Sequence, residues 1–261
     1  MAEEKPDQAS SPFVSMFEGF RAELDEHHDR RERVIKASRD ITASSKKIIF
    51  TLQRVRTVGQ PLPAFVTKSN AQYWETIEKQ YKSIAADLQG LNAYRYSHNI
   101  TGGNQEFMEA LSFQHYLETQ GLITYEEVKS RIATMSSEAG AVLLTPDDYI
   151  LGICDMTGEL MRFSVTSMAT NGKLPSADMA LAQKPRTVLD DLRAIRLQLE
   201  MIEVPGGKFA KELEDKKMPV MRECVDKVEK ALYGLTVRGS ERPKGWLPDM
   251  SNQRGAEVES Y

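Results

Sequence analysis

Apolar residues recur every three to four positions along most of the chain, which is the spacing that places them on one face of an α-helix. The first such pattern follows Ser11 and Pro12, a pair typical of a helix start, and runs without Gly or Pro from Arg21 to Val58. The residues from Asp25 to Arg33 are almost all charged. At 1.5 Å per residue this helix of about 45 residues would be about 70 Å long. We therefore expect part of it to be exposed to solvent or to lie against another subunit.

Similar patterns, separated by clusters of Gly, Pro and Asn, predict further helices along the chain. Two of them begin with strong caps. Thr124 opens a capping box with Glu127, and Thr145 is an N-cap followed by Pro146. The expected segments are residues 69–91, 105–119, 124–135, 145–170, 176–203 with a break at Pro185, and 208–237 with a kink at Pro219. Because alternating strand patterns are essentially absent, we predict an all-α fold, a bundle of about seven helices with a long N-terminal helix.

Composition narrows the class of protein further. We predict a disordered N-terminal segment at residues 1–11, one all-α domain at 12–240 and a C-terminal tail at 241–261. The formal charge is −4, so nucleic acid would bind only through a local patch or a partner subunit. Cys154 and Cys224 lie in apolar helical patterns and are interpreted as core residues in a reducing compartment. No secretory signal is visible and no apolar run approaches the ~20 residues that span a membrane, so we expect a cytoplasmic location and no membrane partner.

Two pairs of acidic residues interrupt helices that otherwise read as buried. Glu106 and Glu109 are three positions apart, and Asp155 and Glu159 are four apart, so each pair lies on one helix face. Burying a carboxylate is costly unless it is paired, hydrogen-bonded or bound to a metal. If the four carboxylates converge, they form an oxygen site of the type that Mg²⁺ or Mn²⁺ prefers. The functional interpretation is a metal site for phosphoryl chemistry, in which the ion neutralises phosphate and activates water.

The alternative interpretation of the four acids is that they occupy ordinary solvated helix faces or form salt bridges between subunits. On the same helix arithmetic, Asp148 and Arg162 join the stripe of Asp155 and Glu159. Arg162 could stabilise phosphate charge or hold Glu159 in an ion pair. His115 points to the opposite side of its helix, which favours a hydrogen-bonded or interface role.

Other chemistries lack their sequence signatures. The chain has no GxxxxGK[ST] loop, no Rossmann fingerprint and no CxxC or HExxH zinc pattern. A di-iron bundle would need Glu-x-x-His motifs, and the acidic pairs lack the histidines. These absences leave the carboxylate site as the main catalytic hypothesis.

Several short runs occur in one order along the chain. They are Ser38-Arg39-Asp40-Ile41-Thr42, Gln105-Glu106-Phe107-Met108-Glu109-Ala110, Asp155-Met156-Thr157-Gly158-Glu159-Leu160-Met161-Arg162 and Val237-Arg238-Gly239-Ser240-Glu241. In this order they resemble the Trax branch of the translin family, over residues 12–250. The resemblance implies an all-α bundle that assembles with translin-like subunits into a closed hetero-oligomer with an internal cavity. It also implies that the Trax-type subunit is catalytic, a Mg²⁺-dependent endoribonuclease acting on single-stranded RNA or short fragments, such as small-RNA passenger strands and tRNA precursor fragments.

The resemblance also assigns roles to individual residues. The catalytic and metal-binding acids of the family match Glu106, Glu109, Asp155 and Glu159, and Arg162 matches a basic residue beside that site. The basic stretch of the first helix is a weaker candidate for RNA contact, with solvated charges as the alternative: Lys46, Lys47, Arg54 and Arg56.

The chain departs from its family in two places. The segment 136–144 looks shorter than in animal relatives, and the N-terminal extension lacks a basic nuclear-import run. The second departure puts nuclear targeting in doubt, so we expect the cytoplasm, with the nucleus as an additional location. Two other functions stay open, a non-catalytic RNA-binding scaffold and a helical adaptor that stabilises translin.

Overall fold

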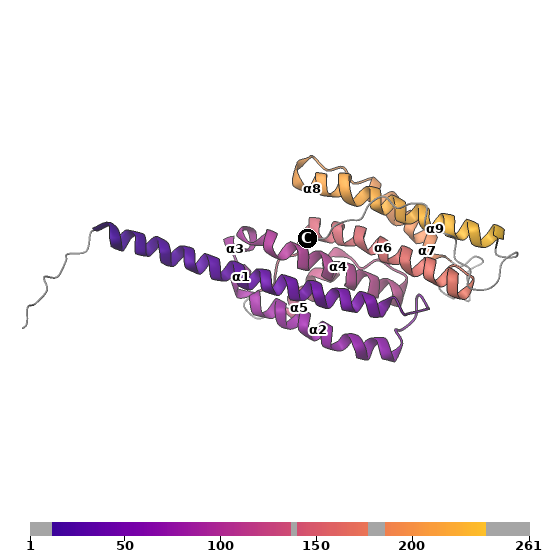
Figure 1. Cartoon of the computed structure of the whole chain (residues 1–261), viewed down its shortest axis with the longest axis horizontal. Helices are drawn as coiled ribbons and strands as arrows, with labels where there is room; N and C mark the ends of the chain where they lie inside the picture. Colours follow the sequence, from indigo (N-terminus) through magenta and orange to yellow (C-terminus); the bar gives the residue numbers. More distant parts are fainter. Residues whose placement is uncertain (1–11, 137–139, 177–185, 239–261) are drawn as a thin grey trace, which may run out of the picture.

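The computed structural model describes residues 12–136, 140–176 and 186–238, and these form a helical bundle from which one helix projects (Figure 1). Because α8, a π-helical turn and α9 follow one another directly, the described residues form seven long helical segments and one short helix, α3. The described part holds an isolated β-bridge between Ser176 and Thr187, and no strand. The elements are α1 (Pro12–Leu52), α2 (Ala64–Ile84), a 3₁₀ turn (Ala86–Leu88), α3 (Leu91–Arg95), α4 (Ser97–Thr119), α5 (Tyr125–Met135), α6 (Pro146–Asn171), α7 (Val188–Glu200), α8 (Gly207–Lys211), the π-helical turn (Glu212–Lys217) and α9 (Met218–Arg238). The predicted all-α bundle with a long first helix is confirmed.

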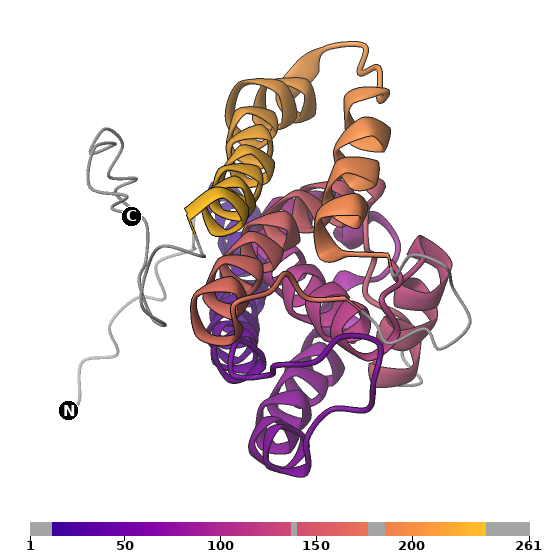
Figure 2. The same ribbon diagram turned by 90° about the vertical axis from the view of Figure 1, so that its right-hand side faces the viewer.

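Helix α4 lies at the centre of the bundle. It packs against α1 on one side and α6 on the other, while α2 covers α1 and the pair α7 and α9 covers α6 (Figures 1 and 2). Its apolar residues are buried on nearly all sides, among them Phe107, Met108, Phe113 and Leu117. Residues 103–118 of this helix, polar ones included, are all buried or partly buried.

The predicted end of the first helix and both predicted ends of the second helix are wrong. The first helix ends at Leu52. The apolar pattern continues beyond it, because Val55 and Val58 lie in an irregular segment but are also buried in the core. The second helix begins at Ala64, directly after Pro63, and ends at Ile84 instead of near residue 91. In both places core packing continues the apolar pattern across a change in backbone conformation.

The connection expected before the third predicted helix is itself helical, because α4 begins at Ser97 and not at Gln105. The glycines there allow α4 and α1 to approach closely. A Cβ at Gly103 would lie 3.0 Å from the backbone oxygen of Ser38, whose hydroxyl accepts a hydrogen bond of 3.0 Å from the Gly103 N–H. Asn104 is fully buried and accepts a hydrogen bond from Tyr81. Small and polar residues serve helix packing here, although their composition resembles that of a loop.

The C-terminal third also differs from its prediction. Among the described residues of the expected helix 176–203, Val188–Glu200 is helical, and it opens with a capping box between Thr187 and Asp190. Pro185 lies outside the described residues, as do the predicted terminal segments 1–11 and 241–261. At Pro219 the expected kink takes the form of the π-helical turn just before it, in which the Met218 N–H donates to the Leu213 carbonyl. A proline cannot donate a backbone hydrogen bond, which favours an irregular turn at this point.

The first fourteen described side chains of α1, residues 13–26, are all exposed, and Figure 1 shows this part of the helix projecting beyond the bundle. We call it the α1 overhang. At its base the His27 imidazole contacts the Tyr96 hydroxyl at 2.5 Å. Arg33 donates two hydrogen bonds to Asp87, at 2.8 and 2.9 Å, and these hold the pKa of that carboxyl below its usual range. The expected exposure is confirmed, but the charged middle of α1 is partly paired within this chain.

Two further sequence interpretations concern the apolar parts of the chain. Cys154 and Cys224 are free and buried, as expected for core residues, and burial raises the pKa of the Cys154 thiol to about 12. Within the described ranges, no helix combines the length and apolar character needed to cross a membrane.

Replacing Gly152 by alanine should destabilise the fold, because Gly152 lies where α6 crosses α4. An added Cβ would meet the Met108 Cβ at 2.4 Å and the Gln105 carbonyl oxygen at 3.0 Å. We expect a loss of about 1–3 kcal/mol in the free energy of unfolding, measured by denaturant titration. Gly158→Ala on the same helix is the control, since its nearest neighbour is the Cys224 sulfur at 4.0 Å. It should instead gain up to about 1 kcal/mol of helix propensity. Equal effects of the two substitutions would contradict the close crossing.

Candidate functional site

The four predicted acids occupy the seam between α4 and α6. Glu106 and Glu109 lie on α4, and Asp155 and Glu159 lie on α6, beyond the close crossing at Gly152. The other three carboxylates all act electrostatically on the Glu109 carboxyl and raise its pKa. The structure therefore brings the four acids into one charged group, which we call the acidic cluster.

Glu109 is the most perturbed member of the acidic cluster. Burial, followed by the charges of Asp155, Glu106 and Glu159, raises its pKa to about 9, although Lys217 acts in the opposite direction. Among the described residues, none forms an ion pair or hydrogen bond with the Glu109 carboxylate. Without an added cation, this carboxyl group therefore holds its proton at neutral pH.

Asp155 is paired with a lysine from a distant part of the chain. The Lys217 ammonium donates to both carboxylate oxygens, at 2.7 and 2.8 Å. Burial raises the pKa of Asp155, and the charge and hydrogen bonds of Lys217 partly offset that rise. Both side chains are largely enclosed, so this ion pair is a stronger interaction than an exposed one.

The remaining two acids interact with α1 or with their own helix. Glu106 pairs with Lys46 at 3.2 Å, and burial raises the pKa of this carboxyl more than Lys46 lowers it. Glu159 accepts a hydrogen bond of 2.6 Å from the side-chain amide of Gln53, and Arg162 lies 3.5 Å from its other oxygen. The ion-pair interpretation of Arg162 is thus what the structure shows, while its side chain remains two-thirds exposed.

Sequence reasoning missed two of these contacts. Lys217 lies in the run Glu212-Leu213-Glu214-Asp215-Lys216-Lys217, which reads as a solvated helix face. Gln53 follows the end of α1, and an isolated glutamine carries no functional signal. Pro219, two residues after Lys217, was the one visible sign that the helix is irregular there.

Asp148 does not belong to the acidic cluster, although the helical arithmetic placed it in the same stripe. It is buried, and it accepts hydrogen bonds from Asn104 and Gln105 at 3.2 Å and from the Thr101 hydroxyl. Its backbone N–H is capped by Thr145. This carboxylate ties the start of α6 to α4 and is fully engaged in that role.

The basic stretch predicted for RNA contact does not form one patch. Lys46 reaches the acidic cluster through Glu106, whereas the Lys47 ammonium lies over the Tyr73 ring and the Arg54 guanidinium over the Phe65 ring. Arg56 donates to backbone carbonyls beside it. Of the four, only Lys46 is placed at the acidic cluster, and a role of any of them in RNA binding stays a prediction. His115, as expected from its helix face, is directed elsewhere and interacts electrostatically with Glu127.

The donor chemistry of the acidic cluster fits a hard divalent cation, because carboxylate oxygens are the ligands that Mg²⁺ and Mn²⁺ prefer. Burial raises the pKa of Glu109 most, and the charges of the other three acids raise it further, so a nearby cation would favour its ionised form. The side chains as they stand are engaged by Lys46, Lys217 and Gln53. In the part of the chain that the structure describes, no three His, Cys, Asp or Glu residues are grouped as ligands of one ion. Metal binding would therefore require these side chains to turn toward one another.

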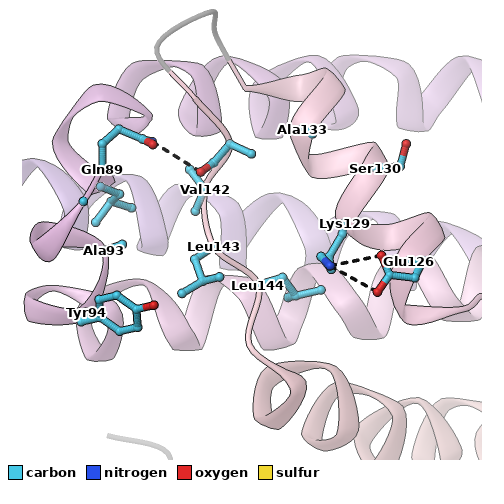
Figure 3. Close-up of a pocket in the computed structure, with 13 residues that line it drawn as sticks. Gln89, Ala93, Tyr94, Glu126, Lys129, Ser130, Ala133, Val142, Leu143 and Leu144 are labelled. Atoms are coloured by element: carbon cyan, nitrogen blue, oxygen red, sulfur yellow. Dashed lines mark hydrogen bonds and ion pairs between the residues drawn. The ribbon is translucent and has the colours of Figure 1, made fainter.

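A cavity of about 680 Å³ lies on another part of the bundle, between α3, α5 and residues 141–144 (Figure 3). Its walls are mostly apolar, including Leu88, Val142 and Leu144. Its charged residues Glu126 and Lys129 neutralise each other at 3.1 Å. Because its charged groups are paired, it is a weaker catalytic candidate than the acidic cluster.

Comparison with known proteins identifies the family of this chain. The family model described as "Translin family" matches residues 29–239. Translin-associated protein X of Rattus norvegicus is 33% identical over 266 residues, covering 95% of this chain and 87% of the relative. The homolog of that protein in Schizosaccharomyces pombe is 34% identical over 227 residues, covering 87% of this chain and 89% of the homolog. Translin of Homo sapiens is 24% identical over 236 residues, covering 88% of this chain and 93% of translin.

Two solved structures share the fold. "Crystal structure of AfC3PO" aligns with a TM-score of 0.57 at 19% identity, covering 85% of this chain and 97% of that one. "Structure of AfC3PO - duplex RNA complex" aligns with a TM-score of 0.59 at 18% identity, covering 87% and 100%. The predicted family is confirmed: the chain belongs to the translin family, and it is more similar to these translin-associated X proteins than to translin.

Proposed function

We propose that this chain is the catalytic subunit of a translin-type complex, a Mg²⁺-dependent endoribonuclease that cleaves single-stranded RNA or short RNA fragments. The observation that carries the proposal is the convergence of four carboxylates from α4 and α6 on one seam, where the partly buried Glu109 has a pKa raised to about 9. A purely structural helix seam would not place Glu109 beside three further acids without an ion-pair partner of its own among the described residues, because enclosing such a carboxyl group is costly. The solved complex of a related fold with duplex RNA supports RNA as the substrate class.

In this proposal the residues of the acidic cluster have distinct roles. Glu106, Glu109, Asp155 and Glu159 would hold Mg²⁺, with Mn²⁺ as a substitute, and the ion supplies charge neutralisation and water activation when bound. Gln53 orients Glu159 through its hydrogen bond of 2.6 Å. Arg162 keeps an exposed guanidinium beside Glu159, where it would contact an RNA phosphate. Glu109 gives up its proton when a cation binds, because the nearby positive charge lowers its pKa.

The direct test is cleavage of a labelled single-stranded oligoribonucleotide by this chain reconstituted with a translin-type partner. We expect cleavage with Mg²⁺ or Mn²⁺, and loss of cleavage with a chelator. An assembled complex that binds the oligonucleotide but never cleaves it would contradict the proposal and favour the RNA-binding scaffold. A duplex of the same sequence tests the preference for single strands.

The proposal includes assembly with translin-like subunits, and the α1 overhang is a surface suited to it. Its large apolar side chains are at least 48% exposed: Phe13, Met16, Phe17, Phe20 and Leu24. The Phe17 and Phe20 rings pack edge to face at 6.3 Å. A stripe of this size that is left in water usually marks a protein interface.

Replacing both Phe17 and Phe20 by serine should weaken assembly without unfolding the bundle. Aromatic residues dominate the binding energy of interfaces, so we expect a loss of about 2 kcal/mol or more of association free energy. Sedimentation with the partner measures assembly, and circular dichroism checks the fold of the assembled wild type and variant. Glu18→Ser on the same overhang is the control and should assemble normally. Unchanged assembly of the double variant would exclude the α1 overhang as the interface.

A further inference from the structure

Lys217 occupies an unusual position for a lysine. It is the last residue of the π-helical turn Glu212–Lys217, and its side chain reaches from the C-terminal segment to the acidic cluster on α4 and α6. Only 23% of the side chain is exposed, whereas the adjacent Lys216 is 68% exposed and pairs within its own helix with Glu212. Single π-helical turns occur frequently at functional sites, because they redirect a side chain away from the regular helical face.

The Lys217 ammonium interacts with more than one member of the acidic cluster. It donates to both oxygens of Asp155, and its charge also lowers the pKa of Glu106 and of Glu109. Lys46 and Arg162 each pair with one acid of the cluster, whereas Lys217 acts on three of the four. A lysine suits that role, because its ammonium is a compact charge on a flexible four-carbon stem.

A metal ion and this ammonium would compete for the same atoms. Mg²⁺ binds oxygen at about 2.1 Å, and the ammonium lies 2.7 and 2.8 Å from the two oxygens of Asp155. Both cations cannot occupy the face of this carboxylate at once. In the metal-free protein, Lys217 thus holds Asp155, while Lys46 and Gln53 hold Glu106 and Glu159.

We propose that Lys217 is a tethered cation that holds Asp155 in the metal-free protein and is displaced by the metal, and that its released ammonium then binds an RNA phosphate at the site. The inference rests on the proposed function, since it takes the acidic cluster as the metal site. Lys217 thereby couples the two ligands. Metal binding frees the ammonium for the phosphate, and the phosphate in turn keeps the ammonium away from Asp155.

The test measures Mn²⁺ binding by electron paramagnetic resonance in the assembled complex, at fixed pH and without RNA. Lys217→Met keeps the length of the side chain but removes the competing charge. Because a unit charge at this range is worth several kcal/mol at an effective dielectric of about 20, we expect Mn²⁺ to bind about tenfold more tightly or better. The Michaelis constant for RNA should rise in the same variant, because a phosphate contact is lost.

Lys216→Met is the matched control and should leave both constants unchanged, since Lys216 pairs with Glu212 outside the acidic cluster. Lys217→Gln is the second variant, for the case in which the methionine variant does not fold. The glutamine side chain retains a hydrogen-bond donor for Asp155 but carries no charge. The complex with this variant should therefore also bind Mn²⁺ more tightly than the wild-type complex.

The outcomes separate this inference from the proposed function. If the wild-type complex binds Mn²⁺ and both Lys217 variants bind it equally or more weakly, the tethered-cation role is wrong and the metal site stands. If the wild type and both Lys217 variants all fail to bind Mn²⁺, the metal site itself is wrong and the inference falls with it. An unchanged Michaelis constant for RNA in a variant with tighter Mn²⁺ binding would overturn the phosphate contact.

Discussion

Asp155→Asn should abolish RNA cleavage by the assembled complex and leave RNA binding nearly intact. The amide is almost isosteric with the carboxylate but carries no charge, so the site loses part of its attraction for Mg²⁺. Without the metal, no water is activated and the developing charge is not neutralised. We expect the cleavage rate to fall by about 100-fold or more, in the range seen when one electrostatic contact to a transition state is removed.

RNA affinity should respond differently, because it depends mainly on basic groups that contact phosphates. Removing one negative charge from the site should, if anything, strengthen binding slightly. The cleavage rate and the dissociation constant are measured in the same complex and at the same salt concentration. Asp147→Asn is the control, since Asp147 is exposed in the first turn of the same helix. Cleavage near the wild-type rate in the Asp155 variant would mean that Asp155 is a structural acid.

The metal-free protein should lose stability as the pH rises from about 4.5 to about 9, because of Glu109. In the unfolded chain this carboxyl ionises near its ordinary pKa of 4.5, whereas in the folded protein it keeps its proton up to about pH 9. Within that window the folded state binds more protons, so each rise in pH favours unfolding. The contribution is at most about 1.4 kcal/mol per pH unit.

Glu109→Gln should remove this pH dependence, since glutamine is neutral at every pH. With a chelator present, the variant and the wild type should melt at similar temperatures near pH 4.5. The variant should melt progressively higher than the wild type as the pH approaches 9. Glu118→Gln is the control, because Glu118 lies on α4 outside the group that acts on Glu109. If the melting temperatures of the wild type and the Glu109 variant change with pH in the same way between pH 4.5 and 9, Glu109 does not keep its proton in the folded protein.

The helix caps and the acidic spacing were readable from the sequence because both depend on local geometry. Thr145 and Pro146 fix the start of α6, and that start sets which face carries Asp155 and Glu159. The same regular arithmetic wrongly included Asp148, whose environment is decided by Asn104 and Gln105 on another helix. Spacing alone shows which residues share a face, but not which helix that face meets.

Lys217 and the start of α4 could not be predicted for a different reason. The lysine reaches Asp155, 62 positions away in the sequence, through a π-helical turn whose backbone has no clear sequence signature. The glycines of α4 resemble a loop until Ser38 of α1 is placed against Gly103. In both cases the deciding contact joins segments that are far apart in the chain.

The exposed α1 overhang should affect the amount of this protein in a cell. A helix with several exposed phenylalanines is an unfavourable state in water, and chaperones and proteases remove proteins that remain in such states. Binding of a partner to the overhang would protect the chain by mass action, because the partner binds only the folded form. The steady-state level of this subunit would then follow the supply of its partner, so that the two are kept in a fixed ratio without matched rates of synthesis.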